Sequence, residues 1–313
     1  MDNLLFSVNI VLPLFLLIAV GALTRKVGLV KESFSEGANS LSFKLFLPVL
    51  LFNNIYHCDL SMSVDPKLMI YAGIGSTAMV LLSLVVVYVF EKDNPKRGTL
   101  MQAMFRSNYL LFATPLCEAM FPENGAAMAS ILSIIIIPLQ NIGAVVLLSI
   151  FGSKQKANFK NTLISILKNP FMIASTIALI LVFTGIRLPQ VVEKTLNNIA
   201  QVATPFALII LGMDLKFGSI KGNLKQVIWG TLGKLVICPL VMLPTAIAMG
   251  FSGAPFAVLL SLYSAPTAVS SYAMAKGAGA DHELAAQLVV STSFFSLFTV
   301  FFFVLISKQL GLV

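Results

Sequence analysis

Long apolar runs recur from one end of this chain to the other, separated by short polar loops. About 20 apolar residues in a helix cross the hydrocarbon layer of a bilayer. Hydrophobic residues make up 58% of the 313 residues and charged residues only 11%, more apolar surface than one soluble core of this size requires. The sequence therefore predicts an all-α polytopic membrane protein with ten transmembrane helices, at residues 4–24, 37–57, 68–90, 99–121, 126–151, 167–186, 194–213, 226–250, 255–276 and 284–306.

The first run is interpreted as a retained span rather than a signal peptide, because it follows Asp2 instead of a basic segment and has no A-x-A cleavage site. The cysteines, Cys58, Cys117 and Cys238, fall in or beside separate spans without C-x-x-C spacing. A disulfide framework or metal cluster is not expected from this spacing, and no cofactor or metal is predicted.

Basic residues indicate the orientation in the membrane, since Lys and Arg are concentrated in cytoplasmic loops. With the N-terminus outside, the outward loops carry only Lys67, Arg187, Lys194 and Lys308. The inward loops carry Arg25, Lys26, Lys31, Lys92, Lys96, Arg97, Lys154, Lys156, Lys160, Lys168, Lys216, Lys221, Lys225 and Lys276. We therefore expect a multi-pass protein of the cell membrane with both termini outside, and the net charge of +8 does not call for a nucleic-acid partner.

The two halves of the chain resemble each other. Pro13 and Pro170, Gly28 and Gly185, and Pro48 and Pro205 are each 157 residues apart. Pro115 and Pro266 are 151 residues apart, so a shorter third span or loop is predicted in the second half. The same offset sets Gln140 and Asn141 opposite Ser291 and Thr292. Because five spans is an odd number, the second copy enters the membrane from the opposite side, and two inverted five-helix repeats are predicted, as in many secondary transporters. Chance matches among 14 prolines are the alternative.

Two prolines interrupt apolar runs, Pro115 after Thr114 and Pro266 after Ser264 and Ala265. Proline removes a backbone donor, and broken backbone survives at membrane depth only inside protein or beside a watery cavity. Thr-Pro is also a helix-start signal, so we expect a half-helix to begin at Thr114 and another near Thr267, with spans 4 and 9 broken and crossed. Their positive N-terminal ends would favour an anion. A simple packing kink is the alternative for either proline alone.

Three basic residues lie inside spans: Lys44, Arg106 and Lys234. Each is costly there unless it meets water or a partner, or extends its side chain to the surface. Lys234 is the deepest and is predicted to contribute to the site, with Arg106 as a possible cavity residue. No pair of buried carboxylates is present to bind Na⁺ or relay protons.

Polar residues near the presumed centre complete the predicted anion site. The expected substrate-binding residues are Asn108, Thr114, Pro115, Gln140, Asn141, Ser264, Ala265, Pro266, Thr267 and Lys234, and the additional cavity candidates are Asn53, Asn54, Arg106, Ser291 and Thr292. A single Ser or Thr in a membrane helix is more often a helix–helix contact than a ligand.

Four stretches carry a resemblance to a known family: "LFLPVLLF" (45–52), "FRSNYLLFATPL" (105–116), "ATPFALIILGMDL" (203–215) and "VVSTSFFSLFTV" (289–300). Their order and spacing along the chain resemble the bacterial branch of the auxin efflux carrier family, which includes the PIN-type auxin exporters. Matching positions for the carboxylate site of the plant exporters are Asn108, Thr114, Pro115, Gln140 and Pro266. At residues 109–113 bulky apolar side chains replace a glycine- and asparagine-rich stretch, which puts an indole acid in doubt as the substrate.

The resemblance implies a scaffold domain and a transport domain that moves in an elevator fashion. The corresponding segments are 1–64 and 153–222 for the scaffold and 65–152 and 223–313 for the transport domain. It further implies transport of a small organic anion, either a carboxylate such as malate or malonate or an auxin-like acid.

The predicted function is therefore a secondary transporter of a small organic anion with alternating access. The open alternatives are a sodium-coupled organic-anion symporter of the bile-acid-carrier kind and a membrane sensor that binds a metabolite without moving it. An enzyme is not expected, because His57 and His282 lie at span edges on opposite sides without a paired nucleophile. The expected partners are the anion and the lipid bilayer, with a homodimer as one option.

Overall fold

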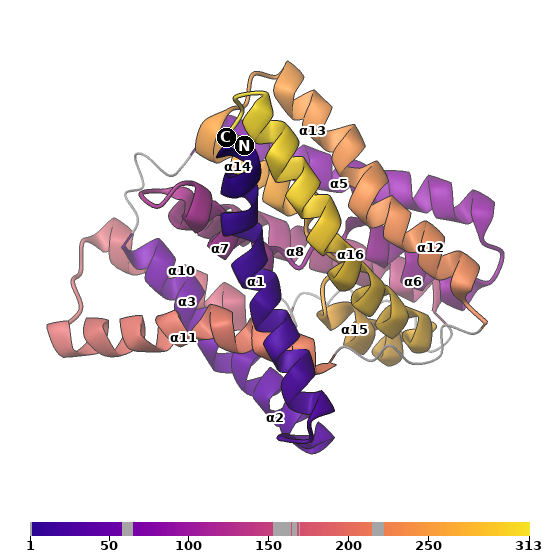
Figure 1. Ribbon diagram of the computed structural model, residues 1–313, viewed down its shortest axis with the longest axis horizontal. Coiled ribbons are helices and arrows are strands. Elements are labelled where there is room, and N and C mark those ends of the chain that lie inside the picture. Colours follow the sequence, from indigo (N-terminus) through magenta and orange to yellow (C-terminus); the bar gives the residue numbers. More distant parts are fainter. Residues whose placement is uncertain (1, 58–64, 153–163, 165–167, 169, 215–221) are drawn as a thin grey trace.

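The computed structural model describes residues 2–57, 65–152, 164, 168, 170–214 and 222–313, and the described residues form helices without strands (Figure 1). The helices are α1 (Asp2–Lys26), α2 (Glu32–Leu41), the π-helical segment η1 (Ser42–Phe46), α3 (Leu47–Tyr56), α5 (Pro66–Phe90), α6 (Asn94–Phe105), α7 (Tyr109–Met120), α8 (Gly125–Phe151), α10 (Pro170–Thr184), α11 (Gln190–Asp214), α12 (Leu224–Leu232), the π-helical segment η2 (Gly233–Ile237), α13 (Cys238–Ala248), α14 (Gly253–Ser264), α15 (Ser270–Ala278) and α16 (His282–Gln309).

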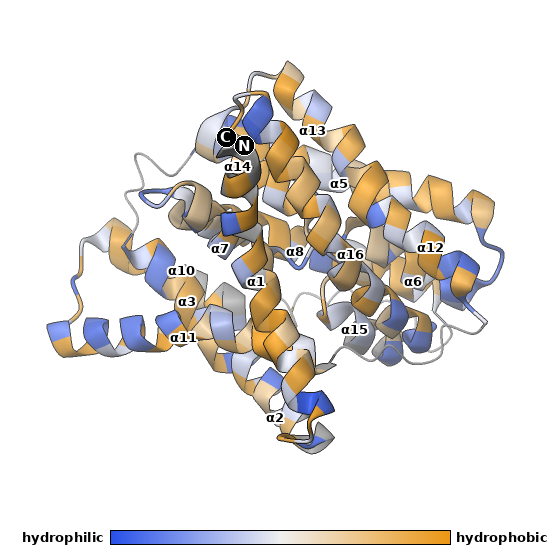
Figure 2. Cartoon of the chain, in the orientation of Figure 1, coloured by the Kyte–Doolittle hydropathy of each residue, from blue (hydrophilic) through white to orange (hydrophobic). Residues whose placement is uncertain are grey.

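Five helical segments in the described part are long and apolar enough to cross a membrane: Pro66–Phe90, Gly125–Phe151, Gln190–Met213, Leu224–Ala248 and His282–Gln309. Hydrophobic residues dominate α1, α5, α12 and α16, whereas hydrophilic residues gather at the start of α11 and around α15 (Figure 2). Large apolar side chains such as Phe298 and Phe302 on α16 face outward. This exposure suits a lipid environment, because a bilayer solvates apolar surface that water would not.

Each apolar run marked in the sequence is helical over most of its described length, although several are composite. Residues 37–57 form α2, η1 and α3 in succession, and residues 226–250 form α12, η2 and α13. The runs at 99–121 and 255–276 are each divided by a non-helical break. These breaks position the candidate site.

Helix bounds recur at a nearly constant spacing. α5 begins at residue 66 and α12 at 224, 158 residues apart; α6 and α14 begin at 94 and 253, 159 apart; α8 and α16 begin at 125 and 282, 157 apart. The predicted offset of 151 between Pro115 and Pro266 is therefore wrong as a register, since no shortened span precedes α14. Gly28 and Gly185 both follow a helix end with positive φ, +77° and +70°, where glycine costs least.

The helices gather into two bundles. One contains α1, η1, α3, α10 and α11, and the other contains α5 to α8 and α12 to α16 (Figure 1). Within the first bundle α1 and α11 approach closely at Gly21 and Gly212, where a Cβ on either glycine would collide with a carbonyl oxygen of the facing helix. Small residues permit such close approach in membrane proteins. The bundles meet mainly through apolar side chains, including Leu51 and Ile55 of α3 and Leu110 of α7.

Candidate functional site

The first break separates α6 from α7 at Arg106, Ser107 and Asn108. Asn108 is the N-cap residue of α7, with φ −74° and ψ 51°, and Arg106 is extended, with φ −70° and ψ 127°. Ser and Asn are common at helix starts, although here Asn108 makes no side-chain cap bond and Ser107 Oγ has no partner among the described residues. The predicted half-helix start at Thr114 is therefore wrong: Thr114 is buried within α7, and Pro115 is inside the same helix, seven residues beyond Asn108.

The second break follows α14 and lies where it was predicted, at Ala265, Pro266 and Thr267. Ala265 has φ −61° and ψ 150°, the extended conformation that a following proline imposes on its predecessor. Pro266 has no N–H, so the break contains one fewer donor to satisfy. The chain becomes helical again at Ser270, the start of α15.

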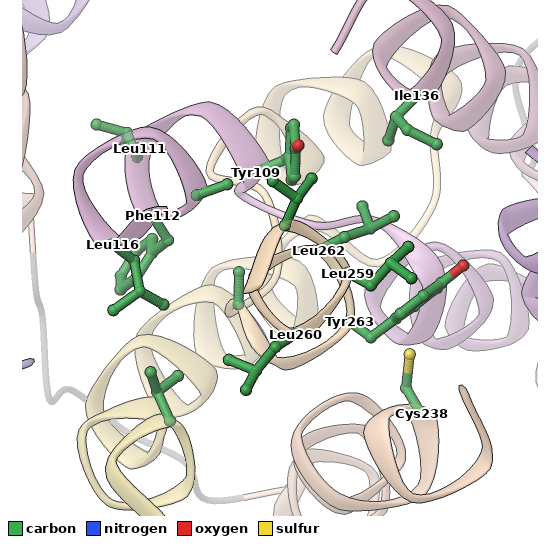
Figure 3. Packing of buried hydrophobic residues seen from close by; sticks show 14 of the residues in the cluster. Tyr109, Leu111, Phe112, Leu116, Ile136, Cys238, Leu259, Leu260, Leu262 and Tyr263 are labelled. Carbon is green, nitrogen blue, oxygen red and sulfur yellow. The ribbon is translucent and has the colours of Figure 1, made fainter. Parts of the chain in front are cut away.

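The two breaks contact each other directly. The backbone N–H of Asn108 donates to the carbonyl oxygen of Pro266 at 2.8 Å, and the hydroxyl of Thr267 donates to the carbonyl oxygen of Ala103 at 2.8 Å. Around this contact, α7 and α14 pack through Phe112, Leu116 and their neighbours (Figure 3). Two stretches of non-helical backbone thus lie together in the interior of the second bundle.

Side chains from the last helix of each half cap the broken backbone. Gln140 of α8 accepts from the N–H of Ser107 at 3.0 Å and donates to the carbonyl oxygen of Phe105 at 3.2 Å. Thr292 of α16 accepts from the N–H of Thr267 at 3.1 Å. Unpaired backbone groups in an apolar interior are costly, so these bonds allow the helices to be interrupted there. Gln140 and Thr292 play matching parts, although the predicted offset of 151 had set Gln140 opposite Ser291.

Arg106 is buried beside the breaks, with 4% of its surface exposed. One guanidinium NH₂ donates to Asn141 Oδ1 at 2.9 Å and to Ser270 Oγ at 2.8 Å. The other contacts Ser271 Oγ at 3.3 Å and Met274 Sδ at 2.9 Å. Each of these partners on the described helices is neutral. A buried charge normally has an opposite charge beside it, so Arg106 is a positive charge available to an anion.

Further hydrogen-bond donors around the first break have no partner among the described residues. They are buried: Arg106 Nε, Ser107 Oγ, Asn108 Nδ2 and the hydroxyl of Tyr109. Leaving such a group unpaired costs about 1–3 kcal/mol. A guanidinium without a charged partner among the described residues, followed in the chain by unpaired donors of Ser107 and Asn108, suits a carboxylate, which only accepts hydrogen bonds when ionised.

The other predicted residues are dispersed. Ser264 Oγ donates to Leu260 O of its own helix, Ser291 Oγ pairs with Thr231 Oγ1 on α12, and Asn54 Nδ2 donates to Ser130 Oγ across the two bundles. Asn53 Oδ1 is buried without a partner in the described part of the chain. Lys234, in η2, is fully buried, and its Nζ makes no hydrogen bond to the breaks or to any other described residue.

Sequence reasoning missed Ser107, Ser270 and Ser271, and it gave Arg106 only a secondary role. The available signal was the cap-forming pair Ser107–Asn108 before an apolar run, a helix-start pattern that needs no proline. The pairing of Arg106 with α15 had no sequence signal, because it depends on how two distant segments meet.

Comparisons with known proteins agree with a transport role. The family model for "Membrane transport protein" matches residues 6–304. An uncharacterized transporter of Methanocaldococcus jannaschii, MJ1031, is 24% identical over 95% of this chain and 97% of its own, and the uncharacterized transporter YfdV of Escherichia coli is 24% identical over 87% and 88%. A protein of Rhizobium meliloti named as a proposed malonate transporter is 23% identical over 93% of both chains. The predicted resemblance to auxin efflux carriers is thereby confirmed, and the chain belongs to this family of membrane transport proteins.

Proposed function

We propose that this membrane transporter is a secondary carrier of a small organic anion, which binds where the two helix breaks meet. The observation that carries the proposal is the buried guanidinium of Arg106, held by neutral partners beside the main-chain contact of Asn108 with Pro266. One carboxylate would accept hydrogen bonds from Arg106, Ser107 and Asn108. The N-terminal ends of α7 and α15 would add their positive dipole ends.

Gln140 has a positioning role in this proposal. Both ends of its amide already bind backbone at the first break, so it fixes the groups that hold the anion. Asn141, one residue further along α8, orients the guanidinium through Oδ1. Thr292 positions the second break in a similar way, because its hydroxyl accepts a hydrogen bond from the N–H of Thr267.

The transport mechanism we propose is alternating access between two inverted repeats of five spans. The spacing of 157 to 159 residues between corresponding helix starts supports the repeat, and the contact of breaks in the fourth and ninth spans resembles the site arrangement of many secondary transporters. The first bundle would be the scaffold and the second the moving transport domain. Their largely apolar interface supports sliding, since few polar bonds must break. The predominance of Lys and Arg in alternate loops favours both termini outside the cell membrane.

A carboxylate screen tests the cargo site. The thermal unfolding temperature of the purified protein is measured with malonate, malate, acetate and indole-3-acetate, in sodium and in potassium buffers. Uptake of the ligand that gives the largest shift is then measured in proteoliposomes. Malonate is included because a relative bears its name. We expect Arg106→Met and Asn108→Ala to weaken the best ligand's affinity at least about tenfold, the effect of losing a charge-assisted hydrogen bond.

The matched control is Lys44→Met, which removes an exposed positive charge from another span. Equal ligand responses in Arg106→Met and the unsubstituted protein would show that the site is elsewhere. A strict sodium requirement would favour the symporter, and saturable binding without uptake would favour a sensor.

A further inference from the structure

The two terminal nitrogens of the Arg106 guanidinium have partners of different strength. Nη2 donates to two oxygen atoms, Asn141 Oδ1 at 2.9 Å and Ser270 Oγ at 2.8 Å. Nη1 contacts the sulfur of Met274 at 2.9 Å and Ser271 Oγ at 3.3 Å, which is longer than a usual N–H···O bond. A thioether sulfur is only a weak acceptor. Nη1 is therefore the more weakly satisfied of the two terminal nitrogens.

Met274 has room to leave Nη1 while α15 stays in place. Its side chain is partly exposed and packs against an apolar cluster that includes Ala275 and Leu148. Methionine is unbranched and has three rotatable side-chain bonds, so it can turn toward this cluster. The first turn of α15 is held to α6 by a separate bond, because Gln102 Nε2 donates to the carbonyl oxygen of Ser271 at 3.0 Å. Rotation of one side chain is thus sufficient to uncover Nη1.

We propose that Met274 determines the affinity for the cargo, because its sulfur competes with the cargo carboxylate for Nη1 of Arg106. This inference rests on the cargo site proposed above. An ionised carboxylate accepts a hydrogen bond from a guanidinium far more strongly than a thioether does, so the carboxylate displaces the sulfur. The contact that is lost counts against binding. The strength of the acceptor at position 274 therefore sets part of the cargo affinity.

The competing explanation is that Met274 only fills space between α15 and its neighbours. Two substitutions separate these roles. Met274→Leu keeps nearly the same volume and removes the acceptor, so a packing role predicts little change. Competition predicts tighter binding, by about two- to tenfold, which corresponds to the net contribution of one hydrogen bond. Affinity is measured by thermal shift with whichever of malonate, malate, acetate and indole-3-acetate gives the largest response.

Met274→Glu supplies a permanent carboxylate to the same nitrogen. We expect it to weaken cargo binding at least about tenfold, because the new side chain occupies Nη1. It should also raise the melting temperature by at least about 2 °C without any ligand, since Arg106 gains an opposite charge. This stabilisation should vanish in the double variant with Arg106→Met, a measurement that needs no cargo. The controls are Met249→Leu and Met249→Glu, at an exposed methionine just beyond α13, which should alter neither quantity.

Two outcomes would overturn this inference alone. One is a cargo affinity in Met274→Leu that is unchanged or weaker, while Arg106→Met abolishes the carboxylate response. The other is a change in melting temperature by Met274→Glu that is the same with and without Arg106. A carboxylate response that survives in Arg106→Met would instead overturn the cargo site, and this inference with it.

Discussion

At the scale of single residues, Gln140 and Thr292 show how a membrane helix can stop in mid-course. Each has a side-chain oxygen that accepts a hydrogen bond from a backbone N–H at a break, a group that would bond within the helix if the helix were continuous. An amide can serve a donor and an acceptor together, so Gln140 satisfies both Ser107 and Phe105, whereas the hydroxyl of Thr292 serves Thr267 alone as an acceptor.

Gln140→Ala should destabilise the protein more than Thr292→Val. The first change leaves two buried backbone groups unpaired and the second leaves one, at about 1–3 kcal/mol for each group. Thermal unfolding in detergent measures the difference. Suitable controls are Gln201→Ala, at an exposed position of α11, and Thr299→Val, whose hydroxyl bonds only its own helix. Melting points that match these controls would show that water or rearrangement satisfies the breaks instead.

Glu91, just beyond the end of α5, gives a pH-dependent contribution to stability. Burial alone would raise the pKa of its carboxyl group, but hydrogen bonds from Gln226 and from the backbone N–H groups of Asp93 and Lys92, with Lys96 nearby, leave the pKa below its ordinary value. The folded state therefore favours the ionised carboxylate. This contribution is present above the unfolded-state pKa, near 4.3, and is lost as the pH falls through the lower folded-state value.

We expect Glu91→Gln to flatten the fall of melting temperature below about pH 4.5, because its side chain does not titrate. Gln226→Leu removes the hydrogen bond from the carboxylate and should flatten the profile partly. Melting curves between about pH 3 and 7 provide the measurement. An acid profile identical to that of the unsubstituted protein would mean that other carboxyl groups determine the acid loss.

At the scale of helices, the sequence was sufficient to place the apolar segments and the second break, because length, hydropathy and the residue before proline act locally. The first break was misplaced because a proline was taken as its cause. Pro115 is tolerated inside α7, while Ser107 and Asn108 interrupt the chain with help from Gln140, a residue of another helix. The sequence contains the cap signal, but not the tertiary partner that makes the break stable.

The crossing of α1 and α11 should be intolerant of added volume. Gly21→Ala and Gly212→Ala each place a methyl group against a carbonyl oxygen of the facing helix, and we expect a loss of about 1–3 kcal/mol, the usual cost of overpacking. Gly37→Ala is the control, because this helical glycine of α2 has open space around its Cβ position and should be neutral or stabilising. Equal melting temperatures for all three variants would show that the two helices separate readily.

At the scale of the whole molecule, the two bundles could not be recognised from composition, since both are apolar and both contain segments from each half of the chain. Which helices belong to which bundle was predicted only from the resemblance to a known family. In the described residues, Asn54 of α3 and Ser130 of α8 join the bundles by a 3.0 Å hydrogen bond between otherwise apolar surfaces.

Cross-linking at this bond should separate binding from transport. In a variant without the three native cysteines, Asn54→Cys and Ser130→Cys are joined by a short bifunctional thiol reagent. If the bundles slide, cross-linked protein keeps the thermal response to its best ligand and loses uptake in proteoliposomes, and each single-cysteine variant treated with the same reagent keeps both. Uptake by fully cross-linked protein would contradict the elevator motion.

The bond between Asn108 N–H and the Pro266 carbonyl is made by main chain alone. Exchange of the surrounding side chains therefore need not break it, so a mutation can alter selectivity without dismantling the junction. Relatives that share about a quarter of their residues with this chain could bind different substrates with the same backbone junction. Directed evolution toward a new cargo should accordingly begin with the side chains of Ser107 and Asn108, because the peptide N–H of Asn108 would still bind the Pro266 carbonyl of the other half.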